Sequence, residues 1–170
     1  MLARMPEMPE VEALAAFLRE RAVGARVARL DLAAISVLKT FDPPVQAVEG
    51  RRITDVGRRG KFLVVELHDP AEAEPRLALV VHLARAGWLQ WKDDVPTTAP
   101  KPGKGPLALR LRLVTDDGEA AGGFDVTEAG TRKSLALYVV RDPADVPGIG
   151  RLGPDPLDPA FDVEALAAVL

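Results

Sequence analysis

The sequence begins with a helical pattern of apolar positions. Within residues 9–20 these positions recur at the intervals of three and four that one face of an α-helix requires: Val11, Leu14, Ala15 and Leu18. Pro9 suits the first turn of a helix, where its missing N–H costs no hydrogen bond. Gly24 follows and is a typical helix stop. The pattern predicts an amphipathic helix over residues 9–20.

From Ala25 to about Asp142 the apolar positions instead alternate with polar ones, which is the period of a β-strand. In LRLRL, residues 109–113, the leucines point to one side and the arginines to the other. Strands are predicted at residues 27–32, 35–38, 53–56, 62–67, 77–83, 88–91, 109–113, 124–126 and 134–140. Short strands with frequent turns favour a mainly β fold, either a two-sheet sandwich or a barrel.

Two stretches rich in proline and glycine interrupt these patterns. Residues 93–106 are predicted to be a loop within the β region. Residues 143–159 have the composition of an interdomain linker, which would follow a β domain over residues 1–142. Helical spacing returns in residues 160–170, with Asp162 as a candidate N-cap. We therefore expect a mainly β domain with flanking helices, the last of which starts a helical second domain.

Composition narrows the possible chemistry. The chain of 170 residues contains no cysteine, so it has no thiol nucleophile and no cysteine-ligated metal. Its two histidines are too few for a histidine-rich metal site, and neither Ser36 nor Ser134 lies in a Gly-x-Ser-x-Gly elbow. No apolar run is long enough to span a membrane. The formal net charge of −3 argues against a generic nucleic-acid binder, which is usually basic.

Three segments contain residues able to do chemistry, although each has an ordinary structural interpretation when taken alone. MPEMPEVE, residues 5–12, reads as a proline-rich lead into the helix, with acidic residues at its positive end. GRRGK, residues 57–61, reads as a solvated hairpin turn. HLARAGW, residues 82–88, reads as a strand end and turn in which His82 has a structural role.

Taken in order, these segments resemble the formamidopyrimidine-DNA glycosylase and endonuclease VIII family of base-excision repair enzymes. The family opening Met-Pro-Glu-Leu-Pro-Glu-Val-Glu is matched at residues 5–12, with Met8 in place of leucine. The family's Arg-Arg-x-Lys-aromatic hairpin is matched at residues 58–62, and its His-Leu-x-x-x-Gly turn at residues 82–87. LGPDPL, residues 152–157, resembles the linker into the family's helix–two-turn–helix domain.

The resemblance implies a two-sheet antiparallel β-sandwich with an N-terminal helix, forming half of a DNA-binding cleft. Residues 160–170 would be the first helix of the helix–two-turn–helix domain. In such enzymes an N-terminal proline amine attacks C1′ of the damaged nucleotide and displaces the base, and the resulting Schiff base drives β- and δ-elimination. The resemblance implies that Pro6 is the nucleophile, Glu7 the proton shuttle and Glu10 a supporting carboxylate. It implies that Lys61 contacts a phosphate or the lesion.

The implied partner is damaged double-stranded DNA, and the implied location is the cytoplasm at the nucleoid. No membrane or protein partner is expected. Candidate DNA contacts are Arg58, Arg59, Arg85, Arg132 and Lys133. No cofactor is expected in this chain, because the family's structural zinc would sit in a C-terminal finger that this sequence does not contain.

Three features depart from the family pattern. Residues 1–4 precede the opening motif, and while they remain attached the nitrogen of Pro6 is an amide. We expect translation to start at Met5, because the rest of the motif follows in register; trimming of the extension is the alternative. Arg85 stands where the family usually has methionine, and the family's Asp-Pro-Arg-Arg-Phe-Gly loop is replaced by residues 126–133. The DNA-contacting C-terminal domains lie outside this sequence, so we expect weak DNA binding and poor glycosylase activity from this chain alone.

Two other interpretations stay open. If the amine is permanently blocked, the chain is a catalytically inactive relic that kept the fold and binds DNA or protein. Alternatively, it is an unrelated β-sandwich binding module with a coincidental proline-rich start.

Overall fold

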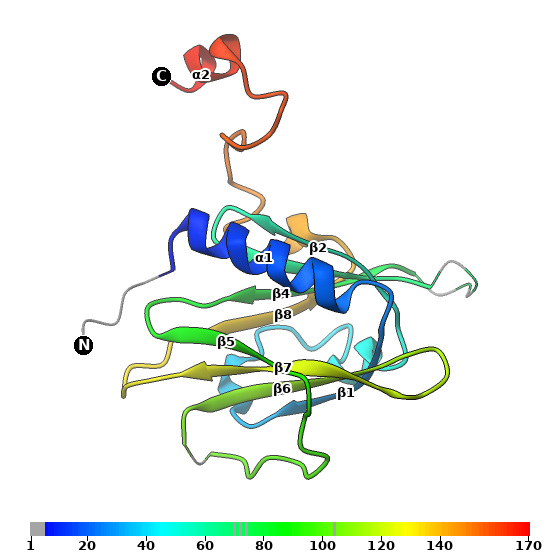
Figure 1. Cartoon of the computed structure of the whole chain (residues 1–170). Coiled ribbons are helices and arrows are strands. Elements are labelled where there is room, and N and C mark those ends of the chain that lie inside the picture. Colours follow the sequence, from blue (N-terminus) through cyan, green and yellow to red (C-terminus); the bar gives the residue numbers. More distant parts are fainter. Residues whose placement is uncertain (1–5, 70, 72, 74, 104) are drawn as a thin grey trace.

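The N-terminal helix, α1 (Met8–Ala22), forms where the apolar periodicity predicts it. Its buried face packs along β2 (Ile53–Arg59) at the side of the sandwich (Figure 1) and consists of Val11, Ala15, Leu18 and Ala22. The computed structural model describes the following residues of the chain: 6–69, 71, 73, 75–103 and 105–170.

Eight antiparallel strands among the described residues form two four-stranded sheets, which confirms the prediction of an antiparallel β-sandwich. The first sheet has the order β1–β6–β7–β5, with the bounds β1 (Arg26–Leu32), β6 (Leu107–Val114), β7 (Ala120–Glu128) and β5 (Gly87–Lys92). The second has the order β2–β3–β4–β8, with β3 (Phe62–Leu67), β4 (Leu77–His82) and β8 (Ala136–Val140). Fully buried side chains from both sheets fill the space between them, among them Leu63, Leu79, Leu109, Leu111 and Phe124.

The prediction of a strand at residues 35–38 is wrong, because the segment forms a short 3₁₀ turn, η1 (Ile35–Val37). It crosses from the first sheet to the second and reaches the edge of β8. There Leu38 pairs with Leu137 in one isolated bridge, and the N–H of Lys39 donates to the Leu137 carbonyl at 2.8 Å. A single bridge provides no continuous ladder along which a strand forms.

Strand β7 begins earlier than predicted because two glycines obscure its apolar alternation. A Cβ atom on Gly122 would lie 2.7 Å from the ring of Trp91, and one on Gly123 would lie 2.1 Å from the Leu111 carbonyl oxygen. These glycines let the neighbouring strands approach closely, a use of glycine that sequence periodicity does not reveal.

The outer face of the second sheet is also covered. A smaller apolar cluster there joins strand residues Val64, Ala78, Val80 and Val140 to Val146 and Ile149 from the proline-rich segment after β8. Strand β4 is therefore buried on both faces, which explains its continuous apolar run. The first part of the predicted linker thus packs on the sandwich, whereas the domain boundaries themselves stay a prediction.

The predicted C-terminal helix is present as α2 (Val163–Val169), and the carboxylate of Asp162 caps it by accepting the N–H of Ala165 at 2.8 Å. Figure 1 shows α2 itself standing apart from the sandwich. Neither α1 nor α2 has the length and apolar character that a bilayer crossing requires, and the same holds for the rest of the described chain.

An ion-pair cluster fastens the end of the sandwich that lies to the right in Figure 1. Asp116, in the β6–β7 hairpin, accepts from Arg52 at 2.7 and 2.9 Å and from Arg26 at 3.0 Å. Asp69, after β3, is buried and accepts from the N–H of Ala71 and from Arg26. The hydrogen bonds from Arg52 and Arg26 lower the pKa of Asp116, and those from Ala71 and Arg26 lower the pKa of Asp69, below the ordinary value of 3.8.

This cluster predicts a specific acid sensitivity. A carboxylate with a lowered folded-state pKa stabilises the fold above its unfolded-state pKa and loses that contribution as the pH falls through the folded-state value. We therefore expect Asp116→Asn to lower the melting temperature at neutral pH, and its difference from the wild type to shrink below about pH 4. Asp117→Asn, on the next residue of the same turn, is the matched control. Equal melting temperatures for the wild type and Asp116→Asn at neutral pH would contradict the role of the cluster.

Candidate active site and nucleic-acid interface

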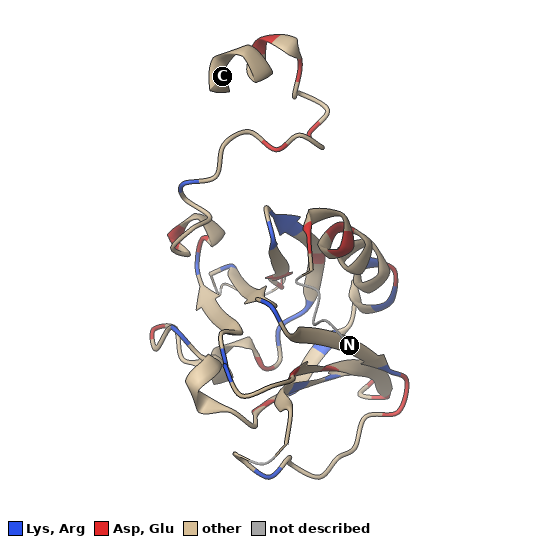
Figure 2. Ribbon diagram, turned by 90° about the vertical axis from the view of Figure 1, so that its left-hand side faces the viewer, with Lys and Arg blue, Asp and Glu red and all other residues tan. Residues whose placement is uncertain are grey.

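Three connections gather at the opposite end of the sandwich, here named the loop end: the β2–β3 hairpin, the β4–β5 turn (residues 83–86) and the β7–β8 loop (residues 129–135). The strand register brings them together, because Phe62 pairs with His82 and His82 pairs with Ala136. The start of α1 lies at this end as well, on the left of Figure 1. Figure 2 looks onto the loop end and shows lysine and arginine positions on the connections that face the viewer.

The start of α1 fixes the position of the proposed nucleophile. Glu7 is the N-cap residue, and its backbone N–H donates to Oε2 of Glu10 at 3.0 Å. This hydrogen bond belongs to a capping box, the arrangement in which the N-cap residue and the third helical residue each accept a backbone N–H of the other. Pro6 directly precedes the cap and is buried. Glu10 therefore holds the backbone next to Pro6. The expectation concerning Met1 to Met5 lies outside the described residues.

Two of the predicted catalytic residues meet across the start of the helix. Lys61 Nζ lies 2.6 Å from Oε2 of Glu7, and both side chains are partly exposed. Gly60, with a φ of +56°, forms the tight turn that presents Lys61 at the hairpin tip. The contact joins residues 54 positions apart in the sequence and places an ammonium against the carboxylate of the residue that follows Pro6. The catalytic roles themselves stay a prediction.

His82 lies next to this pair. Its ring packs on Phe62 with 4.8 Å between the ring centroids. Burial, and then the positive charge of Lys61, lower the pKa of His82 below its ordinary value of 6.5. No group of three or more metal-ligating side chains occurs among the described residues, so the geometry gives His82 no metal partners.

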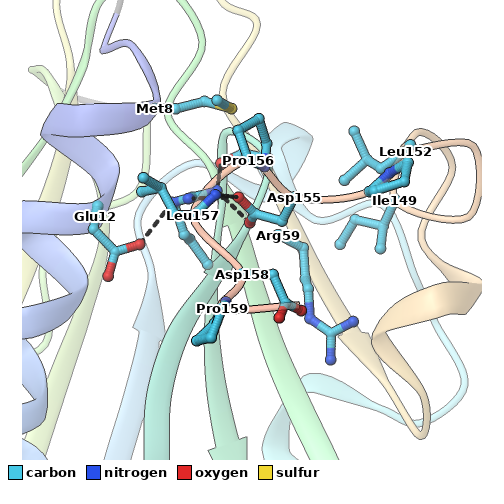
Figure 3. A pocket seen from close by; sticks show the side chains of 14 residues that line it. Met8, Glu12, Arg59, Ile149, Leu152, Asp155, Pro156, Leu157, Asp158 and Pro159 are labelled. Atoms are coloured by element: carbon cyan, nitrogen blue, oxygen red, sulfur yellow. Dashed lines mark hydrogen bonds and ion pairs between the residues drawn. The ribbon is translucent and has the colours of Figure 1, made fainter. Parts of the chain in front are cut away.

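Arg58, a predicted DNA contact, is instead buried inside the protein. Its Nε atom lies 2.7 Å from Glu12 of α1, and its Nη1 and Nη2 atoms donate to Asp155 at 2.8 and 3.0 Å (Figure 3). Its side chain is only 2% exposed. We call these three residues the Arg58 cluster. The cluster ties the hairpin to α1 and to residues 149–159, and it leaves the guanidinium occupied rather than available to a phosphate.

The other predicted DNA contacts are of two kinds, one bonded within the protein and the others exposed without an ion pair to a described residue. Lys133 Nζ donates to the backbone carbonyl of Glu128 at 2.5 Å, so its ammonium is also engaged within the protein. Arg59, Arg85 and Arg132 are exposed, and none of them makes an ion pair with a described residue. These three arginines are the free cations in the predicted set.

An open hollow of about 910 Å³ lies beside the Arg58 cluster, between α1, the hairpin tip and residues 149–159 (Figure 3). Its wall contains Arg59, but neither Glu7 nor Lys61. The hollow therefore adjoins the candidate catalytic pair without containing it.

Three acidic residues that sequence reasoning left without a role shape this end of the molecule. Glu12 and Asp155 neutralise Arg58, but contacts across 46 and 97 positions have no sequence spacing that predicts them. Glu128 is buried, and its Oε1 accepts the N–H groups of Ser134 at 2.6 Å and Leu135 at 2.8 Å. It fixes the β7–β8 loop from within. The one indication of this role in the sequence is that Glu128 lies at the end of a strand whose apolar and polar residues alternate.

Comparison with known proteins defines the class. Residues 5–132 match the family described as formamidopyrimidine-DNA glycosylase N-terminal domain, and the chain belongs to this family. Curated relatives include the formamidopyrimidine-DNA glycosylases of Moorella thermoacetica, 35% identical over 98% of this chain and 56% of its own length, and of Leifsonia xyli subsp. xyli, 33% identical over 98% and 58%. The chain thus spans little more than half the length of these relatives.

Solved structures support the fold. The Lactococcus lactis Fpg protein, in a complex with N7-benzyl-Fapy-dG-containing DNA, superposes with a TM-score of 0.61 at 24% identity, over 79% of this chain and 44% of that one. The same protein in a complex with abasic-site DNA gives a TM-score of 0.61 at 23% identity, with the same coverage. At this level of identity the likeness shows a shared fold.

The Arg58 cluster predicts the effect of removing its cation. Arg58→Met keeps the aliphatic stem but leaves two carboxylates without their donor, and we expect it to lower the free energy of unfolding by about 2 kcal/mol. We also expect faster trypsin cleavage after Arg151, because the neighbouring segment loses its attachment. Urea denaturation and timed proteolysis measure both effects. Arg59→Met removes an adjacent exposed arginine and is expected to change neither; an equal loss in the two variants would argue against the cluster.

The position of His82 beside Lys61 predicts a titration shift. Lys61→Met removes a positive charge that disfavours the imidazolium, so we expect the pKa of His82 to rise toward 6.5 while burial keeps it below that value. Titration of the imidazole resonances by NMR measures the change. Arg59→Met removes the same charge two residues away and is expected to leave His82 unaffected. A His82 pKa that is unchanged in Lys61→Met would contradict this electrostatic contact.

Proposed function

We propose that this domain carries the catalytic amine of a base-excision DNA glycosylase with AP-lyase activity, and that Pro6 supplies the amine once the residues before it are removed. The observation that supports the proposal best is the Glu7–Lys61 pair, held 2.6 Å apart at the start of α1 next to Pro6. In a chain of this family, these are the three positions to which the sequence resemblance assigns the nucleophile, a carboxylate and a cation.

The proposed reaction starts from the neutral secondary amine. An α-amino group has an unperturbed pKa near ~8, so part of it is unprotonated at neutral pH. Its lone pair attacks C1′, the C1′–N glycosidic bond breaks, and the departing base takes up a proton. The C1′–O4′ bond then opens, O4′ takes up the amine proton, and the nitrogen lone pair forms the iminium. Loss of the C2′ proton to a base delivers the electrons of the C2′–H bond to the iminium, and the enamine that results expels the 3′-phosphate. Glu7 is positioned to move protons between the amine and the sugar.

The cations have separate parts in this proposal. Lys61 neutralises Glu7 in the free protein and is placed to exchange this partner for a phosphate or the lesion when DNA arrives. Arg59, Arg85 and Arg132 are exposed and free of ion pairs with described residues, so they are the phosphate contacts that we propose. Arg58 and Lys133 contribute indirectly, by holding the hairpin and the β7–β8 loop in place.

Weak binding by the isolated chain is part of the proposal. Phosphate contacts supply most of the affinity of a protein for DNA, and this chain has a net charge of −3 and about half the length of its relatives. We expect poor turnover from the chain by itself. An inactive DNA-binding or protein-binding relic is the alternative, and one observation favours it: with residues 1–5 attached, the nitrogen of Pro6 is an amide.

Borohydride trapping on abasic-site DNA tests the amine. Two forms of the chain are compared, one starting at Pro6 and one retaining Met1. We expect a covalent protein–DNA adduct from the first form, because reduction accumulates even a weakly formed Schiff base. The Met1 form contains the same lysines and the α-amine of Met1, so it measures the background from all amines other than that of Pro6. Equal trapping by the two forms would refute Pro6 as the nucleophile and leave the relic interpretation.

A further inference from the structure

The chain has two tryptophans, and the structure uses them in opposite ways. Trp91 packs against Gly122 and the main core, and its Nε1 donates to Asp93 at 2.9 Å. Trp88 is 62% exposed, although it lies in the same strand, β5. The two residues are three positions apart, so their side chains emerge on opposite faces of the strand. Tryptophan is highly buried on average, which makes the exposure of Trp88 unusual.

Trp88 lies where two cation-bearing connections of the loop end meet. It is the second residue after the β4–β5 turn, and that turn is tight: a Cβ atom on Gly87 would lie 2.2 Å from the Leu83 carbonyl oxygen. On its other side, Trp88 pairs with Thr127 of β7, while Gly87 pairs with Glu128 at the start of the β7–β8 loop. The backbone N–H of Ala129 donates to Ala86 at 3.1 Å, which joins the two connections.

The charge around Trp88 is positive despite the net negative charge of the chain. Arg85 and Arg132, one on each connection, are exposed and make no ion pair with a described residue. Among the carboxylates nearest in the strand register, Glu128 is buried and its Oε1 accepts two backbone N–H groups. Asp125 accepts from Arg110 at 2.8 Å through both oxygens. The surface thus offers an exposed aromatic ring next to two connections, each of which carries an exposed arginine without an ion-pair partner in the described part of the chain.

We propose that Trp88 stacks on an unpaired nucleobase of a DNA strand whose phosphates contact Arg85 and Arg132. An exposed aromatic ring beside free cations is the combination by which proteins hold single-stranded nucleic acid: the cations track the backbone and the ring stacks on a base. The net positive local charge favours a polyanion over an apolar protein surface as the occupant. This inference rests on the proposed function of the chain in binding DNA, and it adds a base-contacting residue to it.

The intrinsic fluorescence of the chain tests the proposal directly. The chain is titrated with a short single-stranded DNA and with the same sequence as a fully paired duplex, and the signal of Trp88 is the difference between the wild type and Trp88→Phe. We expect single-stranded DNA to quench this difference signal strongly and the paired duplex to quench it less. The remaining Trp91 emission in Trp88→Phe is expected to change less, because that ring lies on the opposite face of β5 and is partly buried against the main core.

Fluorescence anisotropy of labelled single-stranded DNA measures the affinity in parallel. Trp88→Ala is expected to weaken binding roughly ten-fold, and Trp88→Phe less, because a smaller aromatic ring still stacks. Gln90→Ala, two residues along the same exposed face of β5, is the matched control and is expected to bind like the wild type. Since Trp88 is largely exposed, circular dichroism is expected to show the same fold in every variant.

The outcomes separate this inference from the proposed function. DNA binding by the wild type with no quenching of Trp88, and with an unchanged affinity in Trp88→Ala, would overturn the stacking role and leave the proposed function intact. Equal quenching by single-stranded and paired DNA would overturn the preference for an unpaired base. Absence of any DNA binding would overturn both, whereas loss of trapping at Pro6 with Trp88 quenching retained would overturn the proposed chemistry alone.

Discussion

The buried guanidinium of Arg58 is the interaction on which the rest of the site depends. It forms an ion pair with Glu12 on α1 and donates two hydrogen bonds to Asp155 in the proline-rich segment, and it thereby holds both against the β2–β3 hairpin. A buried arginine is tolerable only with such partners, because an unpaired buried charge costs several kcal/mol. The same contacts fix the helix that begins after Pro6 relative to the hairpin that carries Lys61, so the Glu7–Lys61 pair depends on a cluster whose central guanidinium is shielded from solvent.

The fold was largely predictable because apolar periodicity reflects burial directly. The helix over residues 9–20 and most strands followed from spacing alone, and the chain's resemblance to a family resolved the choice between sandwich and barrel. The prediction of a strand at residues 35–38 was wrong because Val37 enters the core from a short 3₁₀ turn, and apolar content without a pairing partner does not make a strand. The early start of β7 was hidden by glycines whose role depends on neighbouring strands.

The site was less predictable because the function of a charge depends on its partner. The Arg-Arg-x-Lys motif predicts the same role for Arg58 and Arg59. In the structure Arg58 is buried between two carboxylates, whereas Arg59 is exposed. The alternation of β2 contained a usable signal, since Val56 and Arg58 are two positions apart and both buried. No such signal existed for Asp155, 97 positions away, or for the role of Glu128, because contacts between distant segments exist only after folding. The sequence therefore identifies a set of candidate cationic residues. The structure shows which of them already bind groups within the described part of the protein and which do not.

The turn that replaces the predicted strand at residues 35–38 also affects how the protein behaves at high concentration. A sandwich of two open sheets has edge strands, and an exposed edge strand is a template on which another polypeptide adds a strand. Along β8 the passing segment occupies backbone groups: Leu137 accepts from Lys39, and the N–H of Val139 donates to the hydroxyl of Thr40 at 2.8 Å. Residues 38–40 thus act as a cover that stops the second sheet from growing into a neighbouring molecule, so their contribution is to colloidal behaviour rather than to chemistry.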